Sequence, residues 1–513
     1  MNYSMHLFLS LATVLFTETP ASDNDDEARP TPPELSDAIA PALQRLHDLV
    51  DTFLQQSVSP IRTHDFEKQL QEMLRELGRA ITQHTYNHLE SADLRPLAKH
   101  LQWEGTAYTR LNAKTPQNAW TLFGQIRLWR VGYRPTDKGG DPTLFPLTQA
   151  LGLVQGASPA LAERAARFLG ETGMTQQRTL DRLRQEHDVG WGVKKLRQVT
   201  DAVAESLAQQ RHEVQVEKLL SLLQKAAAGT GKHKPVLSVG RDGISLGVRF
   251  KRGTLFEVAT TGTVSVLDRR GQRLGTVYLA YTPEPLQPTM SRELTRLLQE
   301  VLTRWQGPLP RLCYVTDSGD NETTYYEKVL ARMKHPRTGA ALEWIRVVDY
   351  YHASERIWTM AELLFGKGQR CAGWARKMQR WLLKPGGVNR LLHSAAAYRD
   401  GSGLSGKKRK EFGKAYRYLR DRMKYLNYAE YRRLGVPVGS GVTEAACKTV
   451  YTQRLKLSGM RWQKAGAQTI LELRVLQLSG VWDQAYRRVL AEFQEAQVRG
   501  QSGSHEKLHE NAA

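Results

Sequence analysis

The stretch from Val438 to Trp462 reads VGSGVTEAACKTVYTQRLKLSGMRW and carries one carboxylate, Glu444, among small and basic residues. The two glycines beside Ser440 allow a turn, and Ser440 is a suitable N-cap, so Glu444 is expected in the first or second turn of a helix that runs to about Leu457. Three side chains share one face of such a helix: Glu444, Lys448 and Tyr451. If Glu444 is a metal ligand, further acidic ligands must come from elsewhere in the chain.

Two aspartates upstream supply them, because each follows a short, β-prone apolar run. Asp242 comes after Val236–Val239, and Asp317 comes after Leu312–Val315. Taken singly, each acid has a plain structural explanation, since Asp is common in turns and Glu is favoured in the first turn of a helix. Together, two strand ends and one helix indicate a metal site. Magnesium prefers oxygen ligands, and two ions about 4 Å apart can hold the attacking and leaving oxygens of a phosphodiester displacement.

Composition points to a polyanionic partner. The 513 residues are 41% hydrophobic without an apolar run of transmembrane length, so we expect a globular chain and no membrane partner. Lys and Arg outnumber Asp and Glu by 73 to 52, a net charge of +21, which favours nucleic acid. The three cysteines lie far apart, so neither a disulfide framework nor a zinc finger is indicated and a reducing compartment is expected: Cys313, Cys371 and Cys447.

The region from residue 233 onward predicts an α/β (α+β) fold with an RNase H-like ordering. The pattern gives strands at Val236–Arg241, Ser245–Phe250, Leu255–Asp268 with an interruption at Gly262, Arg273–Tyr281, Leu312–Thr316 and Trp344–Val348. It gives helices at about Ser291–Trp305, Thr324–Met333 and Ala353–Phe365. Residues 233–365 would form the first part of a catalytic core, 366–437 a basic helical insertion, and 438–495 the C-terminal helices that carry Glu444.

The preceding part is expected to be mainly helical and to bind DNA. Helical periodicity fills much of 35–115, and the segment Trp120–Tyr133, inside a 116–232 region, alternates like a β-hairpin. Three short helices follow at Pro159–Gly170, Met174–His187 and Val193–Leu207, with helix-turn-helix spacing. The third carries Lys194, Lys195 and Arg197 where a recognition helix meets phosphates, although a packing unit with a solvated basic face gives the same pattern.

Both ends of the chain are predicted to lie outside these regions. Residues 1–34 contain an apolar core from Leu7 to Phe16 but no Lys or Arg before it, so we interpret them as an upstream extension or mis-called start and not as a secretory signal. The stretch Ser22–Pro33 is acidic and contains prolines, which is typical of a disordered tether. A disordered tail is expected at 496–513.

In its motifs the chain resembles bacterial insertion-sequence transposases of the DDE class, particularly the ISKra-type group allied to Mutator-like elements. The resemblance covers nearly everything after residue 35. Its most specific piece is GSGVTE at 439–444, with Lys448, Arg454, the SGM of 458–460 and Trp462. The segment DYYH at 349–352 looks like the D-x-x-H signature of that clan, and Trp120–Tyr133 looks like its TLFGxIxLxRxxY segment.

The resemblance implies that Asp242, Asp317 and Glu444 are the catalytic acids and hold two Mg²⁺ or Mn²⁺ ions. Asp320 is a nearby rival to Asp317, but only Asp317 directly follows its strand. The resemblance also places His352 in the site, touching a phosphate; the alternative is an Asp349 and His352 pair that merely begins a helix.

Further basic residues are expected to contact double-stranded DNA. These are Lys448 and Arg454 in the C-terminal stretch, and Lys407, Lys408 and Arg409 in the insertion, for which a solvated helix face is the alternative. The implied activity is cleavage at the ends of an element and joining of the 3′-hydroxyls to target DNA. A homodimer or higher oligomer on DNA, in the cytoplasm of a bacterium and associated with its nucleoid, is expected. The other function considered is a domesticated, transposase-derived DNA-binding protein without catalysis; a covalent recombinase lacks its motifs.

Overall fold

The computed structural model describes residues 34–103, 105–137, 141–251, 253–401 and 403–495. The expectations for residues 1–33 and 496–513 therefore fall outside the described residues. The chain divides into two compact units. Unit 1 comprises residues up to 169, 175–203 and those from 486 onward, and unit 2 comprises 170–174 and 204–485. Among the described helices, none combines the length and the apolar character needed to cross a bilayer.

The described part of unit 1 starts with two long helices, α2 (Leu35–Leu54) and α3 (Pro60–His88), as predicted. Ser59 caps α3 by accepting a hydrogen bond from the Arg62 amide. The prediction that helix dominates up to residue 115 is wrong beyond α3, because β1 (His100–Trp103) and β2 (Thr106–Arg110) pair there as antiparallel strands. The residues of β1 alternate between more and less exposed positions, the period of a strand. A third strand, β5 (Tyr133–Pro135), completes this sheet.

The rest of unit 1 contains the predicted hairpin and helices. Strands β3 (Thr115–Thr121) and β4 (Gly124–Arg130) pair in antiparallel fashion, which confirms the hairpin. Three helices follow: α4 (Pro146–Ala150), α5 (Pro159–Gly170) and α6 (Gln176–His187). The third predicted short helix is instead the start of one 36-residue helix, α7 (Val193–Ala228), and the boundary between the two units falls inside it.

Unit 2 is built on a five-stranded mixed sheet with the order β10-β9-β6-β7-β8. Strands β6 (Val236–Phe250), β7 (Gly253–Leu267) and β8 (Arg273–Tyr281) form an antiparallel meander, whereas β9 (Arg311–Thr316) and β10 (Trp344–Val348) run parallel to β6. The predicted break after Arg241 is wrong: β6 is continuous, because Asp242, Gly243 and Ile244 keep their register with β7. Gly262 likewise does not interrupt β7.

Helices cover both faces of this sheet, so the coarse prediction of a mixed α/β fold is confirmed. Leu237 and Val239 of β6 belong to a core shared with α7, α8 (Pro288–Arg304) and α9 (Asp320–Lys328). Val236, on the opposite face, belongs to a second core shared with the helices that follow β10. Because side chains alternate along a strand, Asp242 points to the same face as Val236.

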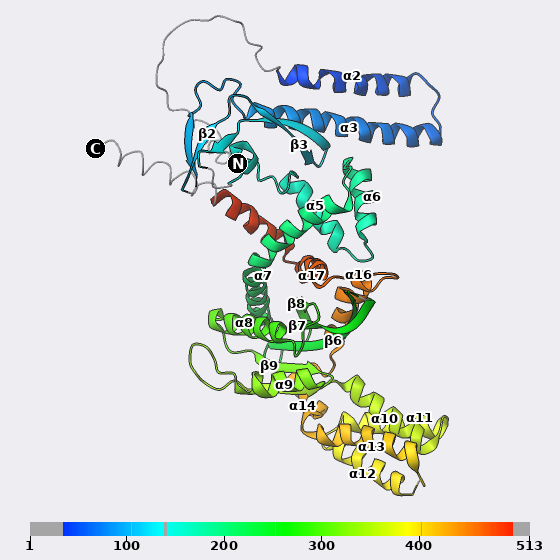
Figure 1. Ribbon diagram of the computed structural model, residues 1–513. Coiled ribbons are helices and arrows are strands. Elements are labelled where there is room, and N and C mark those ends of the chain that lie inside the picture. The colour runs from blue at the N-terminus through cyan, green and yellow to red at the C-terminus, as the bar shows by residue number, and fades with distance from the viewer. Residues whose placement is uncertain (1–33, 104, 138–140, 252, 402, 496–513) are drawn as a thin grey trace, which may run out of the picture. The chain divides into compact units, whose positions relative to one another are not determined.

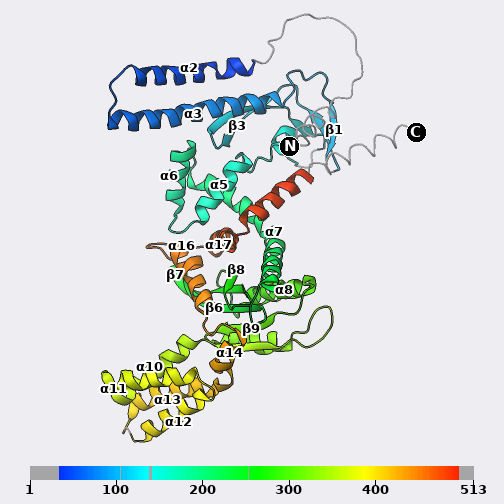
Figure 2. The same cartoon turned by 180° about the vertical axis from the view of Figure 1, so that it is seen from behind.

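The helices on that second face include the predicted insertion, which is helical. Figures 1 and 2 show α10 (Tyr350–Phe365), α11 (Gln369–Leu382), α12 (Gly387–Asp400) and α13 (Gly406–Asp421) side by side. The short α14 (Tyr428–Leu434) leads back to the sheet. The helix predicted from Ser440 to Leu457 is divided into α15 (Gly441–Ala446), a π-helix at Cys447–Thr452 and α16 (Gln453–Leu455). Helix α17 (Lys464–Ser479) follows and packs on β8.

Candidate functional site

The parallel pairing of β6 and β9 brings the two predicted aspartates to the same level of the sheet. The register runs from Val236 opposite Arg311 to Gly240 opposite Val315. Extended by two residues, it sets Asp242 opposite Asp317. Both are partly buried, whereas the rival Asp320 is exposed on the first residue of α9. The structure therefore places Asp317, and not Asp320, beside Asp242.

Asp317 is held by contacts on both its side chain and its backbone. Its Oδ1 accepts a hydrogen bond from the Gly319 amide at 3.0 Å. The Tyr418 hydroxyl, which comes from α13, donates to its carbonyl oxygen at 2.8 Å. The helical insertion thus fixes the loop that carries the second acid.

Helix α15 lies directly on β6, which brings Glu444 to the site. A Cβ added to Gly240 would lie 1.9 Å from Thr443 Oγ1, so only glycine permits this approach. The Thr443 hydroxyl also shares a 2.7 Å hydrogen bond with the hydroxyl of Thr263 on β7. Since Thr443 is fixed against two strands, Glu444, the next residue, emerges at the edge of the helix and remains exposed.

The π-helix turns Cys447 and Tyr451 toward the sheet. Cys447 Sγ donates a hydrogen bond to Asp242 Oδ2 at 3.3 Å. The buried Tyr451 hydroxyl donates to the carbonyls of Thr260 and Tyr281, at 2.8 and 3.0 Å. The prediction that Tyr451 shares a face with Glu444 and Lys448 is therefore wrong, because the wider π-turn changes the angular spacing after Ala446. Lys448 itself is exposed, as expected.

The acids repel one another. Burial raises the pKa of Asp242, and the negative charges of Asp317 and Glu444 raise it further, against the opposing hydrogen bonds from Cys447 and the Gly243 amide. Glu322 of α9 joins this group: burial raises its pKa, and the charges of Asp317 and Asp242 add to the rise. Across the described residues, none of the three predicted acids forms a salt bridge with Lys or Arg. A divalent cation would relieve this repulsion, so the donor set fits a metal.

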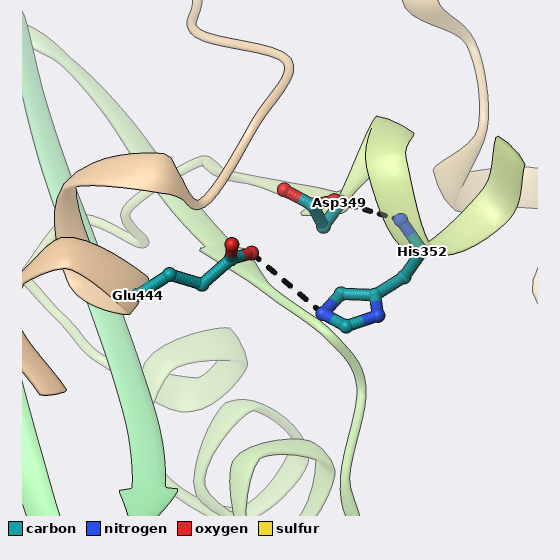
Figure 3. A group of neighbouring side chains, drawn as sticks. All are labelled: Asp349, His352 and Glu444. Carbon is teal, nitrogen blue, oxygen red and sulfur yellow. Dashed lines mark hydrogen bonds and ion pairs between the residues drawn. The ribbon is translucent and has the colours of Figure 1, made fainter. Parts of the chain in front are cut away.

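Glu444 also belongs to a cluster with Asp349 and His352 (Figure 3). One donor atom from each of the three lies within 4.8 Å of the others, and Glu444 Oε1 is 3.6 Å from His352 Nε2. The Ser440 hydroxyl lies between two acids, 2.8 Å from Asp349 Oδ2 and 2.6 Å from Glu444 Oε1. Ser440 therefore positions Glu444. The predicted N-cap is wrong in one respect, because the Ser440 side chain makes no hydrogen bond to the helix backbone.

The Asp349 carboxylate joins the start of α10 to the segment that carries Ser440. It is fully buried, and its carboxylate caps α10 by accepting from the His352 amide at 2.9 Å. It also accepts from the backbone amide and the hydroxyl of Ser440. Because both oxygens already face protein donors, we assign Asp349 to positioning Ser440 and His352. The Asp349 and His352 pair therefore begins helix α10, which was one of the two explanations considered. His352 also lies beside Glu444, as the other explanation requires.

The three predicted acids are not close enough together to hold a single ion. Among the described residues, the acids Asp242, Asp317 and Glu444 do not form a group whose ligand atoms all lie within 4.8 Å. One ion about 2.1 Å from each ligand oxygen requires such closeness. A pair of ions about 4 Å apart, with a shared central ligand, spreads the outer ligands over roughly 8 Å. The charges of both other acids act on Asp242, so Asp242 is the residue suited to be the ligand that two ions share.

The predicted DNA-contacting residues divide by exposure. In unit 1, Lys194 and Arg197 are exposed at the start of α7, and Lys195 is partly exposed. In unit 2, Lys407, Lys408 and Arg409 are exposed on the first turns of α13, as is Lys448 in the π-helix.

The prediction for Arg454 is wrong. Its side chain is fully buried with the guanidinium 5.5 Å from the Trp462 ring, and burial, followed by the charge of Arg474, lowers its pKa to about 10. A side chain in that position packs the core of unit 2 and cannot reach DNA.

Sequence reasoning missed Cys447 and Glu322 and did not predict the contacts that Ser440 and Tyr418 make in the site. Cys447 follows Glu444 by three residues, a helical spacing that could have indicated a shared neighbourhood. Glu322 carries no such signal, because Asp320 stands closer to the strand. The contacts of Ser440 and Tyr418 join segments far apart in the chain and depend on the tertiary structure.

Comparison with known proteins adds one distant similarity. The chain is 26% identical over 382 residues to a Streptococcus gallolyticus protein described as "UPF0236 protein in vanSb 3′ region". The match covers 71% of this chain and 73% of that protein. No protein-family model matches the chain. The description of the relative states no activity, so the function must be argued from the site.

Proposed function

We propose that the chain is a DDE-type DNA transposase, which binds the terminal inverted repeats of its element, cleaves DNA and joins 3′-hydroxyl ends to target DNA. The observation that carries this proposal is the convergence of three acids from separate elements: Asp242 within β6, Asp317 after β9 and Glu444 on α15. Asp317 and Glu444 lie 75 and 202 positions after Asp242 in the chain, and the negative charge of each raises the pKa of Asp242.

The sheet supports an RNase H-like interpretation of unit 2. An antiparallel meander of three strands continues into two strands parallel to the first, with helices on both faces. The inserted helices α11–α14 separate the second acid from the third without disturbing the sheet. The coarse α/β architecture is thus compatible with the implied fold of the family that the motifs resemble.

Asp242, Asp317 and Glu444 would hold two Mg²⁺ or Mn²⁺ ions. Such ions, when bound, neutralise the phosphate and lower the pKa of a coordinated water. The chain itself positions the ligands: the Ser440 hydroxyl lies 2.6 Å from Glu444 Oε1, Cys447 holds Asp242, and the Gly319 amide holds Asp317. His352, 3.6 Å from Glu444, is placed to contact a phosphate next to the site.

Double-stranded DNA is the proposed partner on electrostatic grounds. The net charge of +21 and the exposed Lys194, Lys407 and Lys408 favour phosphate contacts, and the bacterial nucleoid follows as the proposed location.

The decisive experiment replaces one acid without changing its shape. Glu444→Gln is expected to abolish Mg²⁺-dependent cleavage of DNA that carries the element's ends, while affinity for the same DNA stays within about twofold in a mobility-shift assay. Glu355→Gln is the matched control, because Glu355 is exposed and contacts His352 only from its outer side at 3.3 Å. Normal cleavage by Glu444→Gln, or cleavage that persists in EDTA, would rule the proposal out.

A further inference from the structure

The hairpin of α2 and α3 packs along one apolar seam. Residues recur at intervals of four and three on both helices, as in an antiparallel coiled coil: Ala42, Leu46, Leu49 and Phe53 on α2, and Phe66, Leu70, Met73 and Leu77 on α3. The rings of Phe53 and Phe66 lie 4.4 Å apart, and Arg45 pairs with Glu76 at 2.7 Å. These two contacts fix the level and the direction of the helices.

A second apolar stripe runs beside this seam. Leu43 and Val50 each follow a seam residue of α2, Leu74 follows Met73, and Ile81 lies seven residues further on. In an antiparallel pair these positions lie on the side opposite Arg45 and Glu76. Their exposed fractions are 37, 37, 51 and 38%. The Phe53–Phe66 and Arg45–Glu76 contacts align the two helices, so that these side chains follow one another along the hairpin in the order Ile81, Leu43, Leu74 and Val50. Both helices therefore contribute to one continuous stripe.

The hairpin is poorly buried for its length. Ala42 is the one fully buried side chain of α2, and α3 has none. Helix α3 also packs on β4, and the Phe123 ring lies against Gly78. Most helical stability comes from burial of an apolar face, and the second stripe is an apolar face of the pair that stays partly exposed. Figures 1 and 2 show α2 along the outer side of α3, with the hairpin loop extended away from β3 and β4. The second stripe is therefore suited to a further partner.

The charge of the hairpin identifies the kind of partner. Residues 35–88 contain five Lys and Arg against seven Asp and Glu, a net charge of −2 in a chain of +21. That balance does not favour DNA. The positions that flank the stripe on its outer side include no Asp, Glu, Lys or Arg, and the one at Gly78 is covered by the Phe123 ring: Ala40, His47, Leu54, Gln71 and Gly78. When the stripe meets itself across a two-fold axis, no like charges are brought together on these flanks.

We propose that the stripe binds the same stripe of a second copy, so that two α2–α3 hairpins form an antiparallel four-helix bundle. A two-fold interface uses one patch twice, and here the same four side chains face their counterparts. The bundle buries the stripe on both helices and makes the protein a dimer before it meets DNA. The proposal rests on the packing of the hairpin and is independent of the proposed chemistry, although a dimer would present two catalytic sites to two DNA ends.

The test compares two charge variants of the full chain by light scattering after gel filtration, without DNA or metal. The parent should have about twice the 58.0 kDa mass of one chain. Leu43→Glu with Leu74→Glu places carboxylates in the stripe and should weaken the dimer at least about a hundredfold, giving one-chain mass at micromolar concentration. Gln44→Glu with Gln69→Glu adds the same charge to the same helices away from the stripe and should stay dimeric.

Circular dichroism shows whether both variants keep their helices, and Glu444→Gln serves as a second control that should remain dimeric whether or not it cleaves DNA. A monomeric parent, or a stripe variant that remains a dimer with intact helices, would overturn the proposal. If the stripe variant loses its helices, Leu43→Ser with Leu74→Ser provides the readout: a dimer as tight as the parent's would overturn the proposal.

Discussion

Gly240→Ala tests whether the packing of α15 on β6 sets the position of Glu444. The added Cβ would lie 1.9 Å from Thr443 Oγ1 and 2.9 Å from Thr263 Oγ1. Ordinary contact needs about 3.5 Å, so α15 and β6 must separate by roughly 1.5 Å. Thr443 cannot simply rotate away, because it is buried and its hydroxyl is bonded to Thr263.

The expected magnitudes follow from this displacement. Overpacking of a core contact costs about 1–3 kcal/mol of unfolding free energy. A shift of about 1 Å in a catalytic group lowers the rate about a hundredfold, which corresponds to roughly 2.7 kcal/mol in the barrier. Metal-dependent DNA cleavage by Gly240→Ala should therefore fall about a hundredfold or more, and the melting temperature should fall by several degrees.

A double-mutant cycle isolates the cause. Thr443→Ala removes the clashing oxygen, so Gly240→Ala with Thr443→Ala should recover more than about 1 kcal/mol relative to the sum of the single effects. Unchanged cleavage and melting in Gly240→Ala would refute the reasoning. Strict additivity of the two substitutions would show that Thr443 is not what the new methyl group meets.

Three further predictions test the surroundings of the site. Burial raises the pKa of Glu322, so protonated Glu322 stabilises the fold at acid pH, and this contribution is lost as pH rises through the shifted pKa. Glu322→Gln should therefore raise the melting temperature of the metal-free protein at pH 7, and a gain that does not shrink toward acid pH would contradict this. Lys448 is exposed and Arg454 is buried, so Lys448→Gln should reduce the salt dependence of DNA binding by about one unit of slope, whereas Arg454→Met should change stability and leave that slope alone. Ser440→Ala should lower cleavage about tenfold or more through Glu444, at a stability cost of about 1 kcal/mol, and Ser440→Thr should restore part of it; equal cleavage by all three forms would exclude a positioning role for this hydroxyl.

Elements with local signals could be predicted before the fold was known. The strands Arg273–Tyr281 and Trp344–Val348 were predicted with the bounds they have, because their apolar runs end at turn residues. The acids Asp242, Asp317 and Glu444 could be selected because each stands beside a strand or at the start of a helix. The insertion at 366–437 could be predicted as well, because the interval between Asp317 and Glu444 is longer than a compact core needs.

How these elements meet depends on contacts between residues far apart in the chain. The continuation of β6 through Asp242 depends on pairing with β7, a partner that local propensity does not contain. The division of the helix after Ala446 depends on Tyr451, whose hydroxyl is fixed by two carbonyls of the sheet. Arg454 reads as a surface cation in the sequence and is a core residue in the fold, because burial is set by neighbours that lie far away along the chain.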